Sequence, residues 1–437
     1  MAPARPGEAH ETGGDTDDGC RARRHRFTDT LMTDYTIVHD VGELVAGPGA
    51  ERPLEIHEDA AIVATDGTVE AVGPSDELQR EYPPEDAKTA VDADGSAVVP
   101  GFVDPHTHAL FAGDRSDEFE DKLRGKTYQE ILEEGGGILR TVRATREASA
   151  DELLENLLGQ LDAMLAHGTT TVEVKSGYGL DVETETKMLD VIAKADENHP
   201  VDVIPTFLGA HAVPEDAETD EYVDHVIDEQ LPAVVDQGIA EFVDVFCETG
   251  VFDVEQSRRV LEAGMDAGLT PKVHAEELSH IGGTQLAAHL GAASADHLLY
   301  ANEDDMAAVA ETDVTPVLLP GTAFGLGEDY ADAQGFKDAG APVAVATDFN
   351  PNCHSQSMGF AQSLACVGMT MTPAEALVAA TKNAALALDR ENGLGTLQEG
   401  APADLAVLDA PSYVHVAYSY GVNRVGTVLK DGDIAHS

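Results

Sequence analysis

Tryptophan is absent from this sequence of 437 residues, and cysteine occurs only four times. Cys20, Cys247, Cys353 and Cys366 show no CxxC spacing, and four cysteines are too few to hold so long a chain in a disulfide framework. We therefore expect reduced thiols. No run of about 18 apolar residues is present, and the polar N-terminus has no signal-peptide core. These absences predict a cytoplasmic protein without a membrane span.

Basic residues are also scarce. Lys and Arg number 26 against 81 for Asp and Glu, so the formal net charge is -55. Such a chain repels nucleic acid and anionic lipid, and neither is an expected partner. Because 43% of the residues are hydrophobic, we expect the acids to coat a folded core. This composition is typical of halophilic proteins, whose salt-rich cytoplasm screens the repulsion between acids.

Four segments are expected along the chain. Residues 1–31 lack apolar periodicity and are predicted to be a disordered extension. Residues 32–96 have the pattern of short strands, with an Asp-Gly turn between two of them. Residues 97–390 are expected to form a catalytic domain, and residues 391–437 return to turns and strands. The two terminal segments are predicted to build one small β-sandwich domain together.

Strand and helix patterns alternate in the central segment. The first strand is expected over Ala97–Val103, where it leads into the first chemical motif. Further strands are expected at Thr170–Val174, Val201–Phe207, Phe242–Phe246, Pro271–Val273, Ala293–Ala295, Val314–Leu319 and Val343–Ala346. Helices are expected at Asp151–Ala166, Val182–Ala195, Glu221–Asp236, Val254–Ala267, Gly282–His289, Glu303–Ala310, Tyr330–Ala339 and Pro373–Leu388. Eight such strands predict an α/β fold of the (β/α)8 TIM barrel type. A doubly wound sheet is the alternative, although no Gly-rich phosphate turn follows the first strand.

Histidines and a carboxylate follow the predicted strands, where barrel enzymes hold their chemistry. His106 and His108 are two positions apart after the first strand, so their side chains point to the same side. His274, His297 and Asp348 follow strands five, six and eight. Imidazole nitrogens and one carboxylate suit a divalent metal with a position left for water. We expect His106, His108, His274 and Asp348 to be its ligands.

These motifs resemble a known superfamily over nearly the whole chain. The segments VVPGFVDPHTHALFAGDR, HAEE, TDFNP and EGAPADLAVLD are similar to those of the amidohydrolases. Finer segments resemble the imidazolonepropionases among them, namely EVKSGYGL, FLGAHAVP, DVFCE and HAEELSH. The resemblance implies hydrolysis of 4-imidazolone-5-propanoate to N-formimino-L-glutamate in histidine degradation. It further implies a small-molecule substrate, and a homodimer is the expected assembly.

The expected cofactor is one divalent metal per chain, zinc or iron. Amidohydrolases with two metals bridge them through a carboxylated lysine on the fourth strand, and the fourth strand here, EFVDVFCE, contains no lysine. Lys175 belongs to the second strand, which is the wrong strand for a bridge. The ligand set does not decide between zinc and iron.

Three residues are expected to take part in the chemistry. Glu277 lies three residues after His274, a spacing that lets it reach the substrate and shuttle a proton. His297 is expected to act on the attacking water or the oxyanion rather than to bind the metal. Asp348 is expected both to bind the metal and to accept a proton.

Substrate contacts are expected from several loops. Arg115 matches the arginine that holds the substrate carboxylate in the family, with a surface ion pair to Asp114 or Asp117 as the alternative. Tyr178 and His211 match further substrate contacts of the family.

The remaining expected substrate contacts are Glu277, Asn350, Asn352 and Cys353. Asn350 matches the family. Asn352 and Cys353 stand where the family is expected to have a glycine and a small hydroxyl residue, so the fit is looser there.

Two other functions stay open at this stage. A cytosine- or guanine-type aminohydrolase shares the ligand set, but its substrates lack a carboxylate, so Arg115 with Tyr178 and His211 argues against it. A non-enzymatic barrel would be expected to lack some of the ligands, and here the set is complete.

Overall fold

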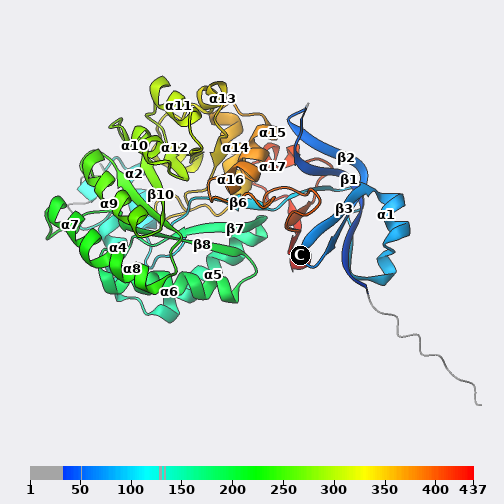
Figure 1. The fold of residues 1–437 in the computed structure, drawn as a ribbon, viewed down its shortest axis with the longest axis horizontal. Coiled ribbons are helices and arrows are strands. Elements are labelled where there is room, and N and C mark those ends of the chain that lie inside the picture. The colour runs from blue at the N-terminus through cyan, green and yellow to red at the C-terminus, as the bar shows by residue number, and fades with distance from the viewer. Residues whose placement is uncertain (1–32, 51, 127–129, 132–133) are drawn as a thin grey trace, which may run out of the picture.

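The computed structural model describes residues 33–437 except 51, 127–129 and 132–133. Figure 1 shows a large domain of strands wrapped by helices and, beside it, a smaller sheet built from both ends of the chain. The extension predicted for residues 1–31 lies outside the described residues. Within the described part of the chain, no helix combines the length and apolar character that a bilayer crossing requires.

The larger sheet is parallel, and its eight strands are neighbours in the order in which they follow one another in sequence. They are β6 Phe102–Asp104, β7 Thr169–Lys175, β8 Asp202–Ala210, β9 Phe242–Cys247, β10 Thr270–Ala275, β11 Ser294–His297, β12 Thr315–Leu318 and β13 Ala344–Val345. A parallel bridge between Thr107 and Phe349, just beyond β6 and β13, brings the two edges together. The strands are almost fully buried, as expected for a parallel sheet covered by helices. The predicted TIM barrel is therefore confirmed.

The helices that surround the barrel lie between its strands or after the last one. They are α2 Ser116–Leu123, α4 Ile138–Glu147, α5 Ala150–Ala166, α6 Val182–Asn198, α7 Thr219–His225, α8 Leu231–Gln237, α9 Val254–Asp266, α10 Gly283–Leu290, α11 Glu303–Ala310, α12 Pro320–Leu326, α13 Ala333–Ala339, α14 Met358–Gly368, α15 Pro373–Ala379 and α16 Lys382–Leu386. The helix predicted over Pro373–Leu388 is interrupted at Thr381, whose backbone is not helical (φ -133°, ψ -95°). The Thr381 hydroxyl donates to the Leu377 carbonyl, 2.7 Å away, and so competes with the backbone for it.

The small sheet is joined by hydrogen bonds in the order β16-β15-β14-β5-β1-β2-β3, with β4 also paired to β1. Its strands are β1 Thr33–Pro48, β2 Leu54–Thr65, β3 Thr68–Pro74, β4 Ala87–Asp92, β5 Ala97–Pro100, β14 Leu405–Leu408, β15 Val425–Lys430 and β16 Asp433–His436. The helix α1 Ser75–Glu81 packs against β1, β2 and β3, whereas α17 Val414–Tyr418, between β14 and β15 in the sequence, packs against α14 and α15. The predicted turn between β2 and β3 is present, with positive φ at Asp66 and Gly67. Both ends of the chain thus contribute to one domain.

The run Ala97–Val103 was expected to be a single barrel strand, and this was wrong. Its first half is β5, which pairs with β1 and β14 in the small sheet, and its second half is β6, which pairs with β7. Gly101 separates them. A Cβ there would lie 2.3 Å from Oγ1 of Thr170, so only glycine lets the chain pass so close to β7. A continuous apolar run does not show which of two sheets accepts each half.

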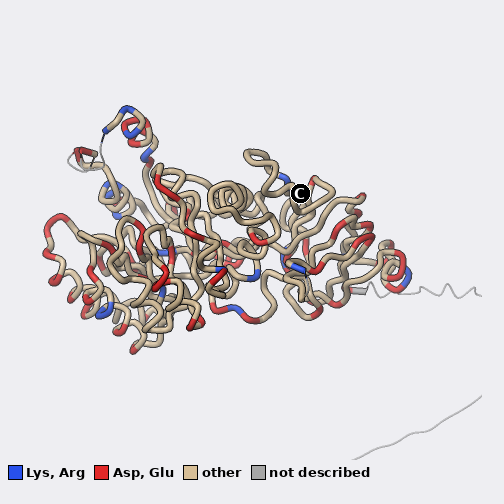
Figure 2. Tube along the Cα trace, turned by 90° about the horizontal axis from the view of Figure 1, so that it is seen from above, with Lys and Arg blue, Asp and Glu red and all other residues tan. Residues whose placement is uncertain are grey.

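Acidic positions cover both domains, and basic positions between them are few (Figure 2). Repulsion among these acids weakens as salt shortens the Debye length from ~10 Å at 0.1 M to ~3 Å at 1 M. We therefore expect the melting temperature and the activity to rise together through a KCl series at fixed pH. Sucrose serves as the control, because it stabilises folded proteins without screening charge. A melting temperature that stays flat or falls toward molar KCl would contradict salt adaptation.

Candidate metal centre and active site

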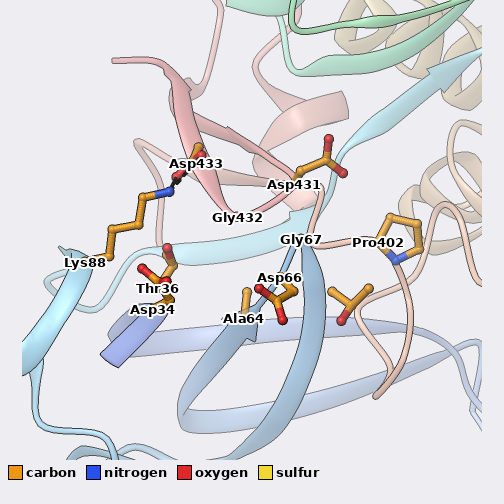
Figure 3. Close-up of a pocket in the computed structure, with 11 residues that line it drawn as sticks. Asp34, Thr36, Ala64, Asp66, Gly67, Lys88, Pro402, Asp431, Gly432 and Asp433 are labelled. Carbon is orange, nitrogen blue, oxygen red and sulfur yellow. Dashed lines mark hydrogen bonds and ion pairs between the residues drawn. The ribbon is translucent and has the colours of Figure 1, made fainter. Parts of the chain in front are cut away.

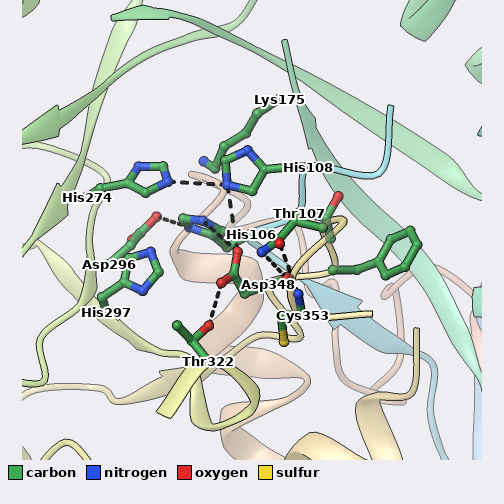
Figure 4. Close-up of polar contacts among 12 residues, drawn as sticks. His106, Thr107, His108, Lys175, His274, Asp296, His297, Thr322, Asp348 and Cys353 are labelled. Atoms are coloured by element: carbon green, nitrogen blue, oxygen red, sulfur yellow. Dashed lines mark hydrogen bonds and ion pairs between the residues drawn. The ribbon is translucent and has the colours of Figure 1, made fainter. Parts of the chain in front are cut away.

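Four histidines and one aspartate converge at the carboxyl-terminal mouth of the barrel (Figure 4). His106 and His108 follow β6, His274 and His297 lie on β10 and β11, and Asp348 follows β13. All five are buried. The Nε2 atoms of His108 and His274 are 3.3 Å apart, and Oδ1 of Asp348 lies 3.7 Å from Nε2 of both His106 and His108. Every strand end that was singled out in the sequence therefore contributes to one cluster.

The donor atoms of this cluster fit a divalent metal. Two groups have ligand atoms within 4.8 Å of one another: His106 with His108 and His274, and His106 with His297 and Asp348. Nε2 of His106, Oδ1 of Asp348 and both ring nitrogens of His297 are buried without a hydrogen-bond partner among the described residues. Polar atoms are rarely left in that state, because their desolvation is then uncompensated. A bound cation would supply the missing partner to the ligating atoms.

The ionisation of three of the four histidines agrees with this role, whereas at His274 burial lowers the pKa but the carboxylate of Asp244 outweighs it and raises the pKa. Burial, followed by the charges of neighbouring residues, holds the pKa of His106, His108 and His297 well below the usual range. These imidazoles are therefore neutral at physiological pH. A histidine must be neutral to bind a metal, so no proton has to be removed before binding.

Carboxylates behind the histidines fix the orientation of two rings. Oδ2 of Asp296 lies 2.6 Å from Nδ1 of His106, and Oδ2 of Asp244 lies 3.0 Å from Nδ1 of His274. Asp244 also pairs with Lys175 at 2.8 Å, and Lys175 pairs with Glu173 at 2.6 Å. Such supporting groups hold the opposite nitrogen toward the metal. Burial raises the pKa of Asp244, but His274 and Lys175 outweigh it and lower that pKa well below its usual value.

Sequence reasoning missed these supporting residues. Asp244 and Asp296 lie within strands of a chain that is acidic throughout, so their acidity alone does not distinguish them. A usable sign was present in β9, where an acid interrupts an otherwise apolar buried strand. Lys175 was considered only as a bridging ligand, whereas the structure shows it neutralising two buried carboxylates.

Glu277 and Asp348 have the properties of groups that exchange protons. Oε2 of Glu277 lies 3.6 Å from Nε2 of His297, and its side chain is 16% exposed. Burial, then the negative charge of Asp348, raises the pKa of Glu277 to about 8. Burial likewise raises the pKa of Asp348 to about 6, although the Thr322 hydroxyl donates to this carboxylate. Thr322 belongs to α12, a Gly-containing helix that the sequence analysis did not predict.

Tyr178 and His211 lie beside the histidine cluster, as the resemblance implies. The His211 ring stacks on His108 with centroids 4.8 Å apart, and the Tyr178 ring is 5.2 Å from His211. Nδ1 of His211 donates to the carbonyl of Gly177 at 2.9 Å, so Nε2 remains for another contact. Burial, then the charge of His274, lowers the pKa of His211 to about 3. A neutral imidazole and a tyrosine thus flank the candidate metal ligands.

Arg115 is buried and paired with Glu118, which follows it by three residues. Its Nε and Nη2 atoms lie 2.9 and 2.8 Å from Oε2 of Glu118. The alternative of a surface pair with Asp114 or Asp117 was wrong, because Asp117 pairs with Arg140 instead. Arg115 also lines a cavity of about 710 Å³ at the barrel mouth.

The polar side chains of the loop after Asp348 form hydrogen bonds mainly within that loop. The Asn350 amide donates to the Asp348 carbonyl at 2.8 Å, and its oxygen accepts from the backbone N–H groups of Asn352 and Cys353. Asn350 therefore shapes the loop that carries Asp348. Asn352 accepts from Lys122, and the Cys353 thiol contacts the Thr347 carbonyl at 3.6 Å. Asn352 and Cys353 line the same cavity as Arg115, and all three loop residues stay predicted substrate contacts.

Three known proteins with similar sequences share one name, and a family model matches most of the chain. The model of the Amidohydrolase family matches residues 97–435. The imidazolonepropionase of Haloarcula marismortui is 71% identical over 405 residues, covering 92% of this chain and 96% of the relative. That of Halobacterium salinarum is 62% identical over 406 residues, with 91% and 97% covered. That of Geobacillus kaustophilus is 50% identical over 385 residues, with 87% and 91% covered.

Solved structures with the same fold are much more distant in sequence. A zinc-bound adenosine deaminase from Xanthomonas campestris superposes with a TM-score of 0.71 at 18% identity, covering 92% of each chain. A triazine hydrolase variant superposes with a TM-score of 0.73 at 17% identity, covering 92% of this chain and 95% of that one. At such low identity these structures support the fold alone.

Proposed function

Because this chain belongs to the amidohydrolase family, and within it to the imidazolonepropionases, we propose that it hydrolyses 4-imidazolone-5-propanoate to N-formimino-L-glutamate. The observation that carries the proposal is the buried cluster of unpartnered histidine and aspartate donors, with Glu277 at its edge. Such a cluster suits the opening of a cyclic amide by water. The relatives of this chain from halophilic archaea also account for its acidic composition.

One divalent ion, zinc or iron, is proposed to be held by His106, His108, His274 and Asp348. When bound, such an ion lowers the pKa of its water from ~16 to ~7 and polarises a carbonyl, so hydroxide is available at neutral pH. Asp296 and Asp244 keep the rings of His106 and His274 turned toward this position. His297 is proposed to lie beside it as a neutral hydrogen-bonding group.

Hydrolysis of the ring requires two proton movements. Water adds to the carbonyl carbon and loses a proton, the C–N bond breaks, and the ring nitrogen gains a proton. Asp348 and Glu277 are proposed to share this transfer, because burial places the pKa of both near neutrality. Glu277 lies at the rim, where it can reach the leaving nitrogen, and Asp348 lies at the centre, where water would be deprotonated.

The reaction can be tested with the metal-loaded protein in molar KCl. Incubation with the imidazolone should give a product that is heavier by one water, and mass spectrometry measures its formation. Cytosine and guanine, offered in parallel, should release no ammonia. Ammonia from either base, with the imidazolone left intact, would overturn the proposed reaction in favour of an aminohydrolase.

Arg115 is proposed to bind the propanoate group of the substrate. Arg115→Ala should raise KM strongly, because loss of one partner of a buried charge pair costs roughly 2–5 kcal/mol, or about 30- to several thousand-fold. The turnover number should change less, since the contact is also made in the ground state. Steady-state kinetics at saturating metal measures both.

Two further variants separate binding from structure. Glu118→Gln weakens the pair that holds Arg115 in place and tests whether its orientation matters. Arg124→Ala removes an exposed arginine at the end of α2 and should leave KM unchanged. If Arg115→Ala behaves like Arg124→Ala, the carboxylate is held elsewhere.

We further propose that the enzyme is a homodimer of the cytoplasm. The three cysteines in the described part of the chain are free, as expected in a reducing compartment. The acid excess suits a cytoplasm of high ionic strength.

A further inference from the structure

The two longest stretches of this sequence without Asp or Glu lie between Asp348 and Glu375 and between Asp409 and Asp431. Elsewhere the chain carries about one acid in every five residues, from 81 in 437. The structure packs these stretches together, because the first contains α14 and the second contains α17 (Figure 1). The Ser363 hydroxyl on α14 donates to the Ala417 carbonyl on α17 at 2.9 Å. Neither of these two distant segments contributes a carboxylate, and we call the surface that they form together the neutral face.

Large apolar side chains are exposed on the neutral face. Val367, on the same row of α14 as Ser363, is 79% exposed. Tyr418 and Tyr420, at and after the end of α17, are 74% and 73% exposed, and Val422 is 56% exposed. Exposed apolar side chains that gather in one region mark interaction surfaces more often than scattered ones do. Tyrosine is moreover enriched where proteins meet.

A small hollow within the neutral face contrasts with the hollows elsewhere on the molecule. It measures about 160 Å³, extends from Phe360 and Ser363 to Tyr420 and Val422, and has no acid among the described residues that line it. In the small domain, by contrast, a hollow of about 550 Å³ contains four aspartates, one of them paired with Lys88 at 2.7 Å (Figure 3). The lack of acids is therefore a property of the neutral face and not of hollows in general.

We propose that two copies of this chain pair through the neutral face, which gives the proposed homodimer its interface. In a two-fold symmetric pair the same surface occurs on both sides, so every acid near the axis would face an acid. Two bodies with a net charge of -55 each repel strongly wherever their carboxylates approach. At the neutral face they can bury valine and tyrosine with fewer such contacts, because the two segments contribute no acid of their own. An acidic partner of another kind would favour a basic surface, and Arg424 and Lys430 are the only formal cations in the two stretches.

Sedimentation velocity in molar KCl tests the proposal. The native protein should sediment as two chains of 46.0 kDa each. Val367→Glu and Tyr418→Asp each place an acid on both sides of the symmetry axis. We expect each variant to raise the dissociation constant of the dimer at least about 100-fold over that of the native protein. Tyr420→Asp, in the loop after α17, is a third variant in case one of the others fails to fold.

Control variants change the charge equally on other faces. Val235→Glu on α8 and Ile434→Asp on β16 replace exposed apolar residues that are 39% and 48% exposed, and both should remain dimers. Ring opening is assayed separately, so failure of the interface is distinguishable from failure of the proposed reaction. A native protein of single-chain mass, unchanged mass in the neutral-face variants, or dissociation of the controls as well would each overturn the proposal.

Discussion

His274→Ala is expected to yield a folded protein that retains neither metal nor activity. The imidazole supplies Nε2, which lies 3.3 Å from Nε2 of His108, while its other nitrogen is held by Asp244. Loss of a metal-supporting group outside the ligands costs roughly 10–100-fold in metal affinity, and loss of a ligand should cost more. Metal content after gel filtration, measured by plasma mass spectrometry, gives the result independently of activity.

Two comparisons make the His274 result specific. His289→Ala removes an exposed histidine at the end of α10 and should leave the metal content unchanged. Asp244→Asn keeps the ligand but removes the charge behind it, so its metal affinity should fall between those of the other two proteins. If His274→Ala still holds one metal per chain, the ligand assignment is wrong.

Glu277→Gln should lower turnover by about two to four orders of magnitude, the usual contribution of a general acid or base. Glutamine has the same size and can still accept a hydrogen bond, but it cannot exchange a proton at neutral pH. Because Glu277 is not an expected ligand, the variant should keep its metal. Single-turnover kinetics, combined with metal analysis of the same sample, separates these two effects.

The neighbouring residue provides a contrast for Glu277. Glu276 is buried and accepts backbone hydrogen bonds from Gly282, Gly283 and Thr284 at the start of α10. Glu276→Gln should therefore lower the melting temperature, while the enzyme that remains folded keeps its turnover number. A fall of less than tenfold for Glu277→Gln would exclude it as the proton shuttle.

The positions of the candidate ligands could be predicted because each follows directly on an apolar run. An eight-fold alternation of strand and helix fixes which ends of the strands share a face, so His106, His274 and Asp348 could be brought together without coordinates. The structure agrees with this arrangement.

Other parts of the site depend on geometry that the residue pattern does not contain. The pairing of Asp244 with Lys175 joins two strands that are not neighbours, β9 and β7, and acids are so common in this chain that Asp244 is not conspicuous. Thr322 contacts Asp348 from the short helix α12, which has one proline and two glycines among its seven residues. This composition argues against a helix. Likewise, the partner of Arg115 depends on the backbone path into α2.

The pairing of β5 with β14 has a consequence for the newly made chain. Residues 97–100 emerge from the ribosome about 300 residues before residues 405–408, which is roughly 15–60 s at the ~5–20 residues per second of synthesis. During that interval one edge of β5 has no native neighbour, and an open edge can pair with another chain. The edge is only four residues long, which limits such pairing. Completion of the small sheet must then be among the last folding events, and it joins the two ends of the chain only after the barrel between them has been synthesised.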